Sequence, residues 1–197
     1  MTSHTPPLKP ASVRSRVGRR LALCLTLLLP LLAIAAERVW FENVRVYRSG
    51  EHYVLDLDSR LRLRARPTEA LANGVSLYFD LDIVVKRQRN LWPDETVNSI
   101  RKRYRLFYFE LTRHFRVTEI ETGRASNFSS LEEALQHLGN LRAEPLVRIK
   151  DVDQPQRYRV ELQLAIDHSE LPAPLQIQAY TTRRYRMKSD VLVWPLD

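Results

Sequence analysis

Hydrophobic and polar residues alternate along much of the chain that follows the first 36 residues. Over residues 52–64 the apolar positions share one parity and charged residues fill the other; the apolar ones are Leu55, Leu57, Leu61 and Leu63. Residues 75–87 repeat this pattern with Leu77, Phe79, Leu81, Ile83 and Val85. Because successive side chains of a strand point to opposite faces, both stretches are predicted to be half-buried strands. The two strands could pair with each other.

Several other segments also have the character of strands. They are residues 40–48, 104–111, 115–121, 125–128 and 158–167, with closing strands expected at residues 177–180 and 191–194. A turn at Ser49-Gly50 predicts an N-terminal hairpin, and a turn at Thr122-Gly123 predicts a meander. Residues 171–175, which contain two prolines, are expected to form an extended loop.

Two segments favour a helix instead. Pro67 stands where a first helical turn tolerates proline, and Asn73-Gly74 supplies a stop, so residues 67–72 are expected to form a short connecting helix. Residues 131–138 have apolar residues at helical spacing, either Ser129 or Ser130 can cap them, and Gly139 ends the helix. The whole pattern predicts a mainly β fold: a single antiparallel β-sandwich-like domain with one or two short helices.

The first 36 residues predict export. Four arginines precede the apolar run of residues 21–36, and no acidic residue occurs before Glu37. This order is typical of a signal peptide for the Sec route, with cleavage expected after Ala35 or Ala36. The alternative is an uncleaved inner-membrane anchor, but 16 apolar residues fall short of the roughly 20 that a membrane-spanning helix needs. Residues 37–197 are expected to form one periplasmic domain in either case.

Removal of this segment changes what the composition implies. The first 36 residues hold five of the 31 basic residues and none of the 23 acidic residues, which leaves 26 against 23, a net charge of +3. The pI of about 9.9 therefore overstates the attraction to anionic partners, and nucleic acid is not expected as a partner in the periplasm. The only cysteine, Cys24, also lies in this segment, so no disulfide or thiol nucleophile is expected in the mature domain.

Several stretches of the chain carry a family resemblance. They are residues 73–82 (NGVSLYFDLD), 103–112 (RYRLFYFELT), 128–135 (FSSLEEAL) and 170–176 (ELPAPLQ). The chain resembles DUF4390, a family of exported proteobacterial proteins, over nearly all of its mature length. The resemblance implies a predominantly β exported domain, without an assigned activity, cofactor or active-site residue. The resemblance also implies a gene neighbourhood that includes one gene for an RNA methyltransferase and one for a membrane sensor histidine kinase.

Two acidic pairs are candidates for chemistry on the polar faces of the first two strands: Asp56 with Asp58, and Asp80 with Asp82. Their oxygens could converge on a divalent cation. The same faces carry basic residues, namely Arg60, Arg62, Arg64 and Lys86. Cross-strand ion pairing is the simpler interpretation, and no metal ligand is assigned.

A second candidate mixes cations with aromatic rings. It spans residues 101–109, is continued by Arg113, Phe115 and Arg116, and is echoed by residues 183–186. In an exported protein it could bind anionic glycans, lipid head groups or an acidic protein surface. Alternatively, these side chains only cover the exposed face of ordinary strands and have no binding role. The candidate binding surface consists of Arg103, Tyr104, Arg105, Tyr108 and Arg116.

The mature chain shows no catalytic motif. Its histidines (His52, His114, His137 and His168) lack zinc-site spacing, and its four glycines form neither a phosphate-binding loop nor a nucleophile elbow. No catalytic residue and no cofactor are therefore expected. We expect a non-enzymatic binding or accessory protein of the periplasm, whose partner could be an envelope or inner-membrane protein.

Two alternatives come from other functional classes. One is a regulatory partner of a membrane sensor histidine kinase, which rests on the gene neighbourhood of the family. The other is an unrecognised hydrolase, which would need a pocket holding convergent polar groups with perturbed ionisation.

Overall fold

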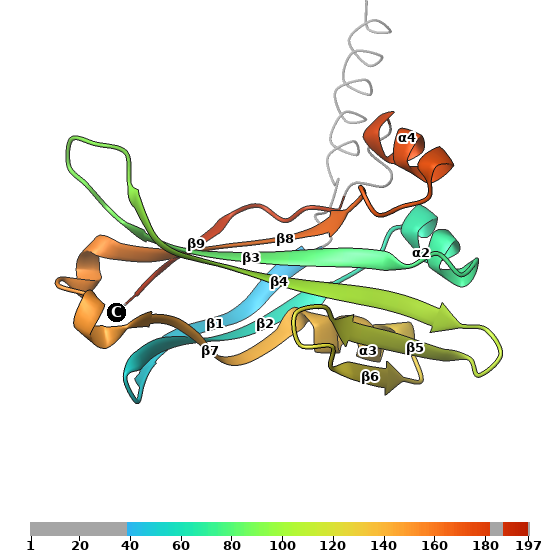
Figure 1. Cartoon of the computed structure of the whole chain (residues 1–197), viewed down its shortest axis with the longest axis horizontal. Helices are drawn as coiled ribbons and strands as arrows, with labels where there is room; N and C mark the ends of the chain where they lie inside the picture. Colours follow the sequence, from blue (N-terminus) through green and yellow to red (C-terminus); the bar gives the residue numbers. More distant parts are fainter. Residues whose placement is uncertain (1–38, 182–186, 197) are drawn as a thin grey trace, which may run out of the picture. The chain divides into compact units, whose positions relative to one another are not determined.

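Antiparallel strands make up most of the part of the chain that the computed structural model describes, which is residues 39–181 and 187–196 (Figure 1). The strands are β1 (Val39–Ser49), β2 (His52–Leu61), β3 (Leu77–Arg87), β4 (Glu95–Phe109), β5 (His114–Glu119), β6 (Ala125–Phe128), β7 (Asn140–Arg148), β8 (Tyr158–Asp167) and β9 (Leu192–Pro195). The helices are α2 (Ala65–Ala72), α3 (Leu131–Gly139) and α4 (Ala173–Thr181), with short 3-10 turns η2 (Ile149–Asp151) and η3 (Pro155–Arg157).

The strands form two antiparallel sheets. The smaller has the order β1-β2-β7, and the larger has the order β6-β5-β4-β3-β8-β9. Apolar residues of both sheets join in one hydrophobic core, with Leu55 and Leu57 from β2 and Phe79 and Ile83 from β3 fully buried. The mainly β, sandwich-like fold predicted from the alternation is confirmed.

The alternating stretches 52–64 and 75–87 do not pair with each other, contrary to the sequence prediction. β2 pairs with β1 and β7, whereas β3 pairs with β4 and β8 in the other sheet. The connecting helix α2 carries the chain from one sheet to the other, and it buries Pro67, Ala70 and Leu71. Alternation shows which face of a strand is buried, but it holds no information about the neighbouring strand.

The segment that follows β8 also differs from the prediction. Residues 171–175 were expected to be an extended loop and residues 177–180 a strand, but the chain forms helix α4 from Ala173. The reason is that Pro174 falls in the first turn, where proline costs no hydrogen bond. The Gln176 side-chain amide donates to the carbonyl oxygens of Ser169 and Leu171, at 2.6 and 2.7 Å, and ties the helix to the preceding turn.

Two further stretches of strand have no counterpart in the sequence prediction. β4 begins at Glu95 rather than near residue 104, and β7 lies where no strand was expected. β7 contains Pro145, and it lies at an edge of the smaller sheet, where proline is tolerated.

Helix α3 begins and ends as its sequence predicts. Ser130 is the N-cap: its hydroxyl accepts a hydrogen bond from the Glu133 amide at 3.2 Å. The Glu133 carboxylate in turn accepts bonds from the amide and hydroxyl of Ser129, at 3.2 and 2.9 Å. At its other end the helix packs closely on β2, where the Ser59 hydroxyl donates to the Gly139 carbonyl at 2.8 Å. Gly139 is thus a point of close approach as well as the helix end.

The predicted signal peptide, residues 1–36, and its cleavage positions Ala35 and Ala36 lie outside the described residues. Within the described ranges, none of the helices has the length and apolar character needed to cross a bilayer.

Candidate binding surface

The five residues of the predicted binding surface lie on two opposite faces of the larger sheet. Tyr104 is 7% exposed and belongs to the core, and Tyr108 is partly buried against the same core. Because side chains alternate along β4, Arg103 and Arg105 point to the other, outer face. Arg116 of β5 is the cross-strand partner of Phe107 and shares this outer face. The structure therefore brings together three of the five residues and separates the two tyrosines from them.

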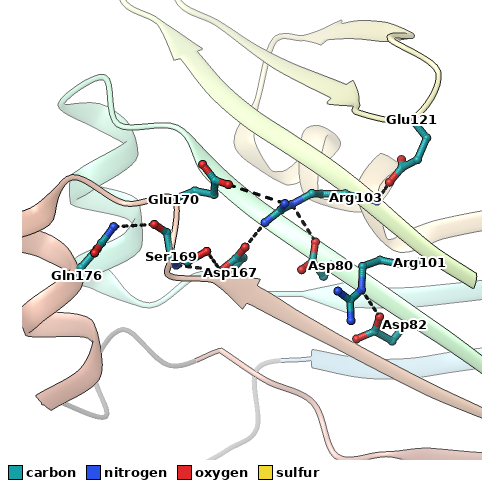
Figure 2. Close-up of polar contacts among 9 residues, drawn as sticks. All are labelled: Asp80, Asp82, Arg101, Arg103, Glu121, Asp167, Ser169, Glu170 and Gln176. Carbon is teal, nitrogen blue, oxygen red and sulfur yellow. Dashed lines mark hydrogen bonds and ion pairs between the residues drawn. The ribbon is translucent and has the colours of Figure 1, made fainter.

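Arg103 is held by acidic residues on three sides, as Figure 2 shows. Its guanidinium pairs with Asp80 of β3 at 3.2 Å, with Asp167 at the end of β8, and with Glu170 at 3.8 Å. The Arg103 amide also donates to the Glu121 carboxylate at 2.9 Å. This Arg103 cluster ties the centre of the larger sheet to the turn before α4. Its charge is therefore neutralised within the protein.

The carboxyl groups of the Arg103 cluster have opposite pKa shifts. Burial raises the pKa of Asp80 and outweighs the opposing charge of Arg103. Burial also acts to raise the pKa of Asp167, but two hydrogen bonds from Ser169, at 2.7 and 2.8 Å, together with the charge of Arg103, give a net lowering. Asp167 is thus the carboxylate that the folded protein favours in its charged form.

A second group of side chains lies further along the outer face. We call Arg105, Phe107, Phe109 and Arg116 the aromatic–arginine patch. The rings of Phe107 and Phe109 meet edge to face, with 4.7 Å between centroids and 82° between planes. The guanidinium carbon of Arg116 lies 4.7 Å from the centroid of the Phe109 ring. Arg116 also donates to the Asn127 side-chain oxygen at 2.9 Å, which fixes its position on the sheet.

The arginines of the patch differ from Arg103 in having no acidic partner among the described residues. Among the described residues, neither Arg105 nor Arg116 has a carboxylate within 4 Å, and Arg105 is exposed. By contrast, the Arg101 side chain pairs with Asp82 at 2.6 Å (Figure 2). The patch thus carries two positive charges without acidic partners in the described part of the chain, next to partly exposed aromatic rings.

Tyr104 and Tyr108 were among the five residues predicted for the surface, whereas Phe107 and Phe109 belonged only to the wider stretch of residues 101–109. Strand parity is the signal that separates them, because Arg105, Phe107 and Phe109 are two residues apart, whereas Tyr104 shares the parity of buried Leu106. Residues 183–186, which repeat the mixture of arginine and aromatic residues in the sequence, lie outside the described residues.

Tyr104 lines a cavity of about 330 Å³ on the inner face of the larger sheet. The cavity is bounded by β4, β5 and β6 on one side and by α3 and β7 on the other. At its wall the Lys102 ammonium lies 2.9 Å from Glu144 and 3.7 Å from Glu119. Glu119 also accepts hydrogen bonds from Arg124, at 2.9 Å, and from the Thr122 hydroxyl, at 2.5 Å.

The ionisation of these groups does not match acid–base catalysis near neutral pH. Burial acts to raise the pKa of Glu119, but the hydrogen bonds from Thr122 and Arg124 and the charge of Lys102 lower it overall. Burial, followed by the charges of Glu119 and Glu144, raises the pKa of Tyr104 to about 12. A general acid or base works best with a pKa near the working pH. Near neutral pH the carboxylate of Glu119 therefore stays charged and the phenol of Tyr104 stays neutral.

The two acidic pairs considered as cation ligands do not converge. Asp56 and Asp58 lie in the smaller sheet, and Asp80 and Asp82 lie in the larger one. Each acid pairs across strands with an arginine, in the pairs Arg45–Asp56 (3.1 Å), Arg142–Asp58, Arg103–Asp80 (3.2 Å) and Arg101–Asp82 (2.6 Å). Cross-strand ion pairing is therefore confirmed, although with arginines other than those named from the sequence. The described residues contain no cluster of three or more metal-ligating side chains.

Fold and surface together define a two-sheet antiparallel β domain with an open outer face that carries aromatic rings and arginines. Residues 36–195 match the family described as Domain of unknown function (DUF4390), and the chain belongs to that family. This confirms the resemblance seen in the sequence. Neither a curated protein nor a solved structure matches the chain significantly.

Proposed function

We propose that this protein is an exported, non-enzymatic accessory protein that binds an acidic surface of an envelope protein through the aromatic–arginine patch. Export rests on the first 36 residues, whose basic start, apolar run and small residues are typical of a signal peptide. The observation that carries the binding function is the pair of arginines that have no carboxylate partner in the described part of the chain.

The composition of the patch supports a protein partner. Arginine and aromatic residues are enriched in protein–protein interfaces, where they supply most of the binding free energy. The patch lies on the outer face of neighbouring strands, β4 and β5, whereas small-molecule sites are usually concave. A sheet face of this kind suits another protein surface.

The charges support an acidic partner. Arg101 and Arg103 already meet carboxylates of this chain, so a partner would have to displace those contacts to use them. Arg105 and Arg116 have no such contact among the described residues. Opposite charges on a partner would speed the encounter and fix its orientation.

Site-specific photo-crosslinking in living cells tests this proposal. A photoreactive residue at Thr118, the cross-strand neighbour of Arg105, should capture one envelope protein. The substitution Arg105→Glu should abolish the crosslink, because it places like charges in contact. Arg60→Glu is the matched control: Arg60 is an exposed strand arginine of the smaller sheet, and its reversal should leave the crosslink intact.

The outcomes separate the proposal from its competitors. Persistence of the crosslink in the Arg105→Glu variant would contradict binding through the patch. Capture of a sensor kinase ectodomain would specify the partner as the regulatory one considered from the sequence. Co-sedimentation with lipid vesicles or peptidoglycan sacculi is measured on the same variant. If Arg105→Glu abolishes this co-sedimentation and leaves every protein crosslink intact, the patch binds lipid or glycan, and the protein partner is refuted.

A further inference from the structure

The cavity beside Lys102 collects polar groups that the described protein leaves without hydrogen bonds. The Tyr104 hydroxyl, the Ser126 hydroxyl and the side-chain amide of Asn140 line the cavity, and none of these three side-chain groups has a hydrogen-bond partner among the described residues. Tyr104 as a residue is only 7% exposed, but its hydroxyl still reaches solvent, and Ser126 and Asn140 are half-buried. Polar side chains that converge on a cavity without partners in the protein are available to water or to a polar ligand.

The backbone is shaped so that it places Glu144 at this cavity. In β7, Leu141 lies opposite Leu57 and Glu144 lies opposite Leu55, so three residues of β7 span a step that takes two in β2. The extra residue is accommodated at Ala143, whose φ of 49° is unusual for a residue other than glycine. The Ala143 amide donates to Asp56 at 2.9 Å, which holds this bulge. Bulges of this kind redirect side chains, and here the bulge directs Glu144 toward Lys102.

The charged groups that line the cavity all take part in ion pairs within the protein; they are Lys102, Glu119, Arg124, Glu144 and Arg142, the last paired with Asp58. Lys102 lies between Glu119 and Glu144, while Arg124 pairs with Glu119. A ligand with a strong net charge would be repelled by one set of these groups. A hydroxyl group, by contrast, can donate to a carboxylate and accept from an ammonium or guanidinium at the same time.

We propose that this cavity, between α3 and the facing strands β4, β5, β6 and β7, binds a neutral, hydroxyl-rich molecule of monosaccharide size. Its volume of about 330 Å³ lies at the lower end of the range for ligand pockets. The Tyr104 hydroxyl, the Asn140 amide and the Glu144 carboxylate recognise hydroxyl groups of the ligand. The proposal is independent of the aromatic–arginine patch, which lies on the opposite face of the larger sheet.

Calorimetric titration with defined sugars tests the proposal on the full mature protein. The probes are glucose, galactose and N-acetylglucosamine as neutral ligands, with glucuronate and glucosamine as charged counterparts. At least one neutral sugar should bind saturably at concentrations up to about 20 mM and should raise the melting temperature. The charged counterpart of that sugar should bind more weakly.

Two matched tyrosine variants locate the site. Tyr104→Phe removes the hydroxyl from the cavity without changing the ring, and it should weaken binding by about tenfold or more, because ligand hydroxyl groups then face an apolar edge. Tyr108→Phe is the control: this tyrosine lies on the same face of β4, with its ring 4.7 Å from that of Phe115, but it does not line the cavity. The control variant should bind as the parent protein does.

Three results would overturn the proposal. If no neutral sugar binds, the cavity is occupied by water alone. Equal binding by the Tyr104→Phe variant would show that any sugar binds elsewhere, and tighter binding of a charged counterpart would refute the neutral ligand. The Arg105→Glu variant should retain sugar binding, so failure of the proposed protein-binding function is distinguishable from failure of this inference.

Discussion

Replacement of Gly139 by alanine should destabilise the protein, although alanine is the better helix former. Gly139 is the last residue of α3 and has a negative φ, so backbone strain does not decide the outcome. A Cβ atom there would lie 2.4 Å from the Ser59 carbonyl oxygen and 2.6 Å from a methyl group of Leu61. Since ordinary contact begins near 3.4 Å, helix and strand would have to separate by about 1 Å.

The structure allows the size of this effect to be estimated. Overpacking costs about 1–3 kcal/mol, and loss of the buried hydrogen bond from Ser59 to Gly139 costs about 1 kcal/mol more. The gain in helix propensity offsets about 1 kcal/mol. The net loss is about 1–3 kcal/mol, which for a domain of this size lowers the melting temperature by roughly 2–12 °C.

Urea denaturation followed by circular dichroism measures this free energy of unfolding directly. The double variant Ser59→Ala/Gly139→Ala should be no more stable than Gly139→Ala, because the nearest obstacle is a backbone carbonyl rather than the serine hydroxyl. If Gly139→Ala is as stable as the parent protein, or more stable as propensity alone requires, the packing argument is wrong.

Three further predictions concern the cap of α3 and the Arg103 cluster. Ser130→Ala removes the cap and should lower the free energy of unfolding by about 1 kcal/mol in urea titrations, with the helix retained by circular dichroism. Asp167→Asn should cost about 1–3 kcal/mol, and clearly more than Asp80→Asn in the same assay, because only the pKa of Asp167 is lowered; equal losses would contradict this. The lowered pKa also means that the unfolded chain takes up the proton first, so stability present above the ordinary value of 3.8 should fall on acidification. A series of urea titrations from pH 6 to about pH 3 should show that loss, and it should be smaller in Asp167→Asn.

The buried faces of the strands could be predicted from the sequence, but the way the strands assemble could not. Alternation correctly identified the inward residues of β2 and β3, because it depends only on the local geometry of a strand. It could not show that these strands belong to different sheets. β7 escaped prediction because the bulge at Ala143 interrupts its alternation, and α4 was mistaken for a loop because Pro174 suits both structures.

For the candidate sites, too, the direction of a side chain could be predicted from the sequence, but its partners from distant strands could not. Parity along β4 is sufficient to separate the outward Arg105 from the inward Tyr104. Lys102 carried a second signal, since it is a charged residue with the parity of buried Leu106. Its partners Glu119 and Glu144 come from β5 and β7, and only the register of the sheets and the bulge in β7 bring them together.

The long separation between β2 and β7 has a consequence for how the chain folds. Leu57 of β2 accepts a hydrogen bond from Arg142, which follows it 85 residues later. At roughly 5–20 residues per second, synthesis of that interval takes about 4–17 s, during which the β1–β2 segment has no third strand to pair with. Until β7 arrives, the hairpin presents Leu55 and Leu57 and an unpaired edge to its surroundings. A holding chaperone that covers this segment until β7 is available would keep it from pairing with other chains.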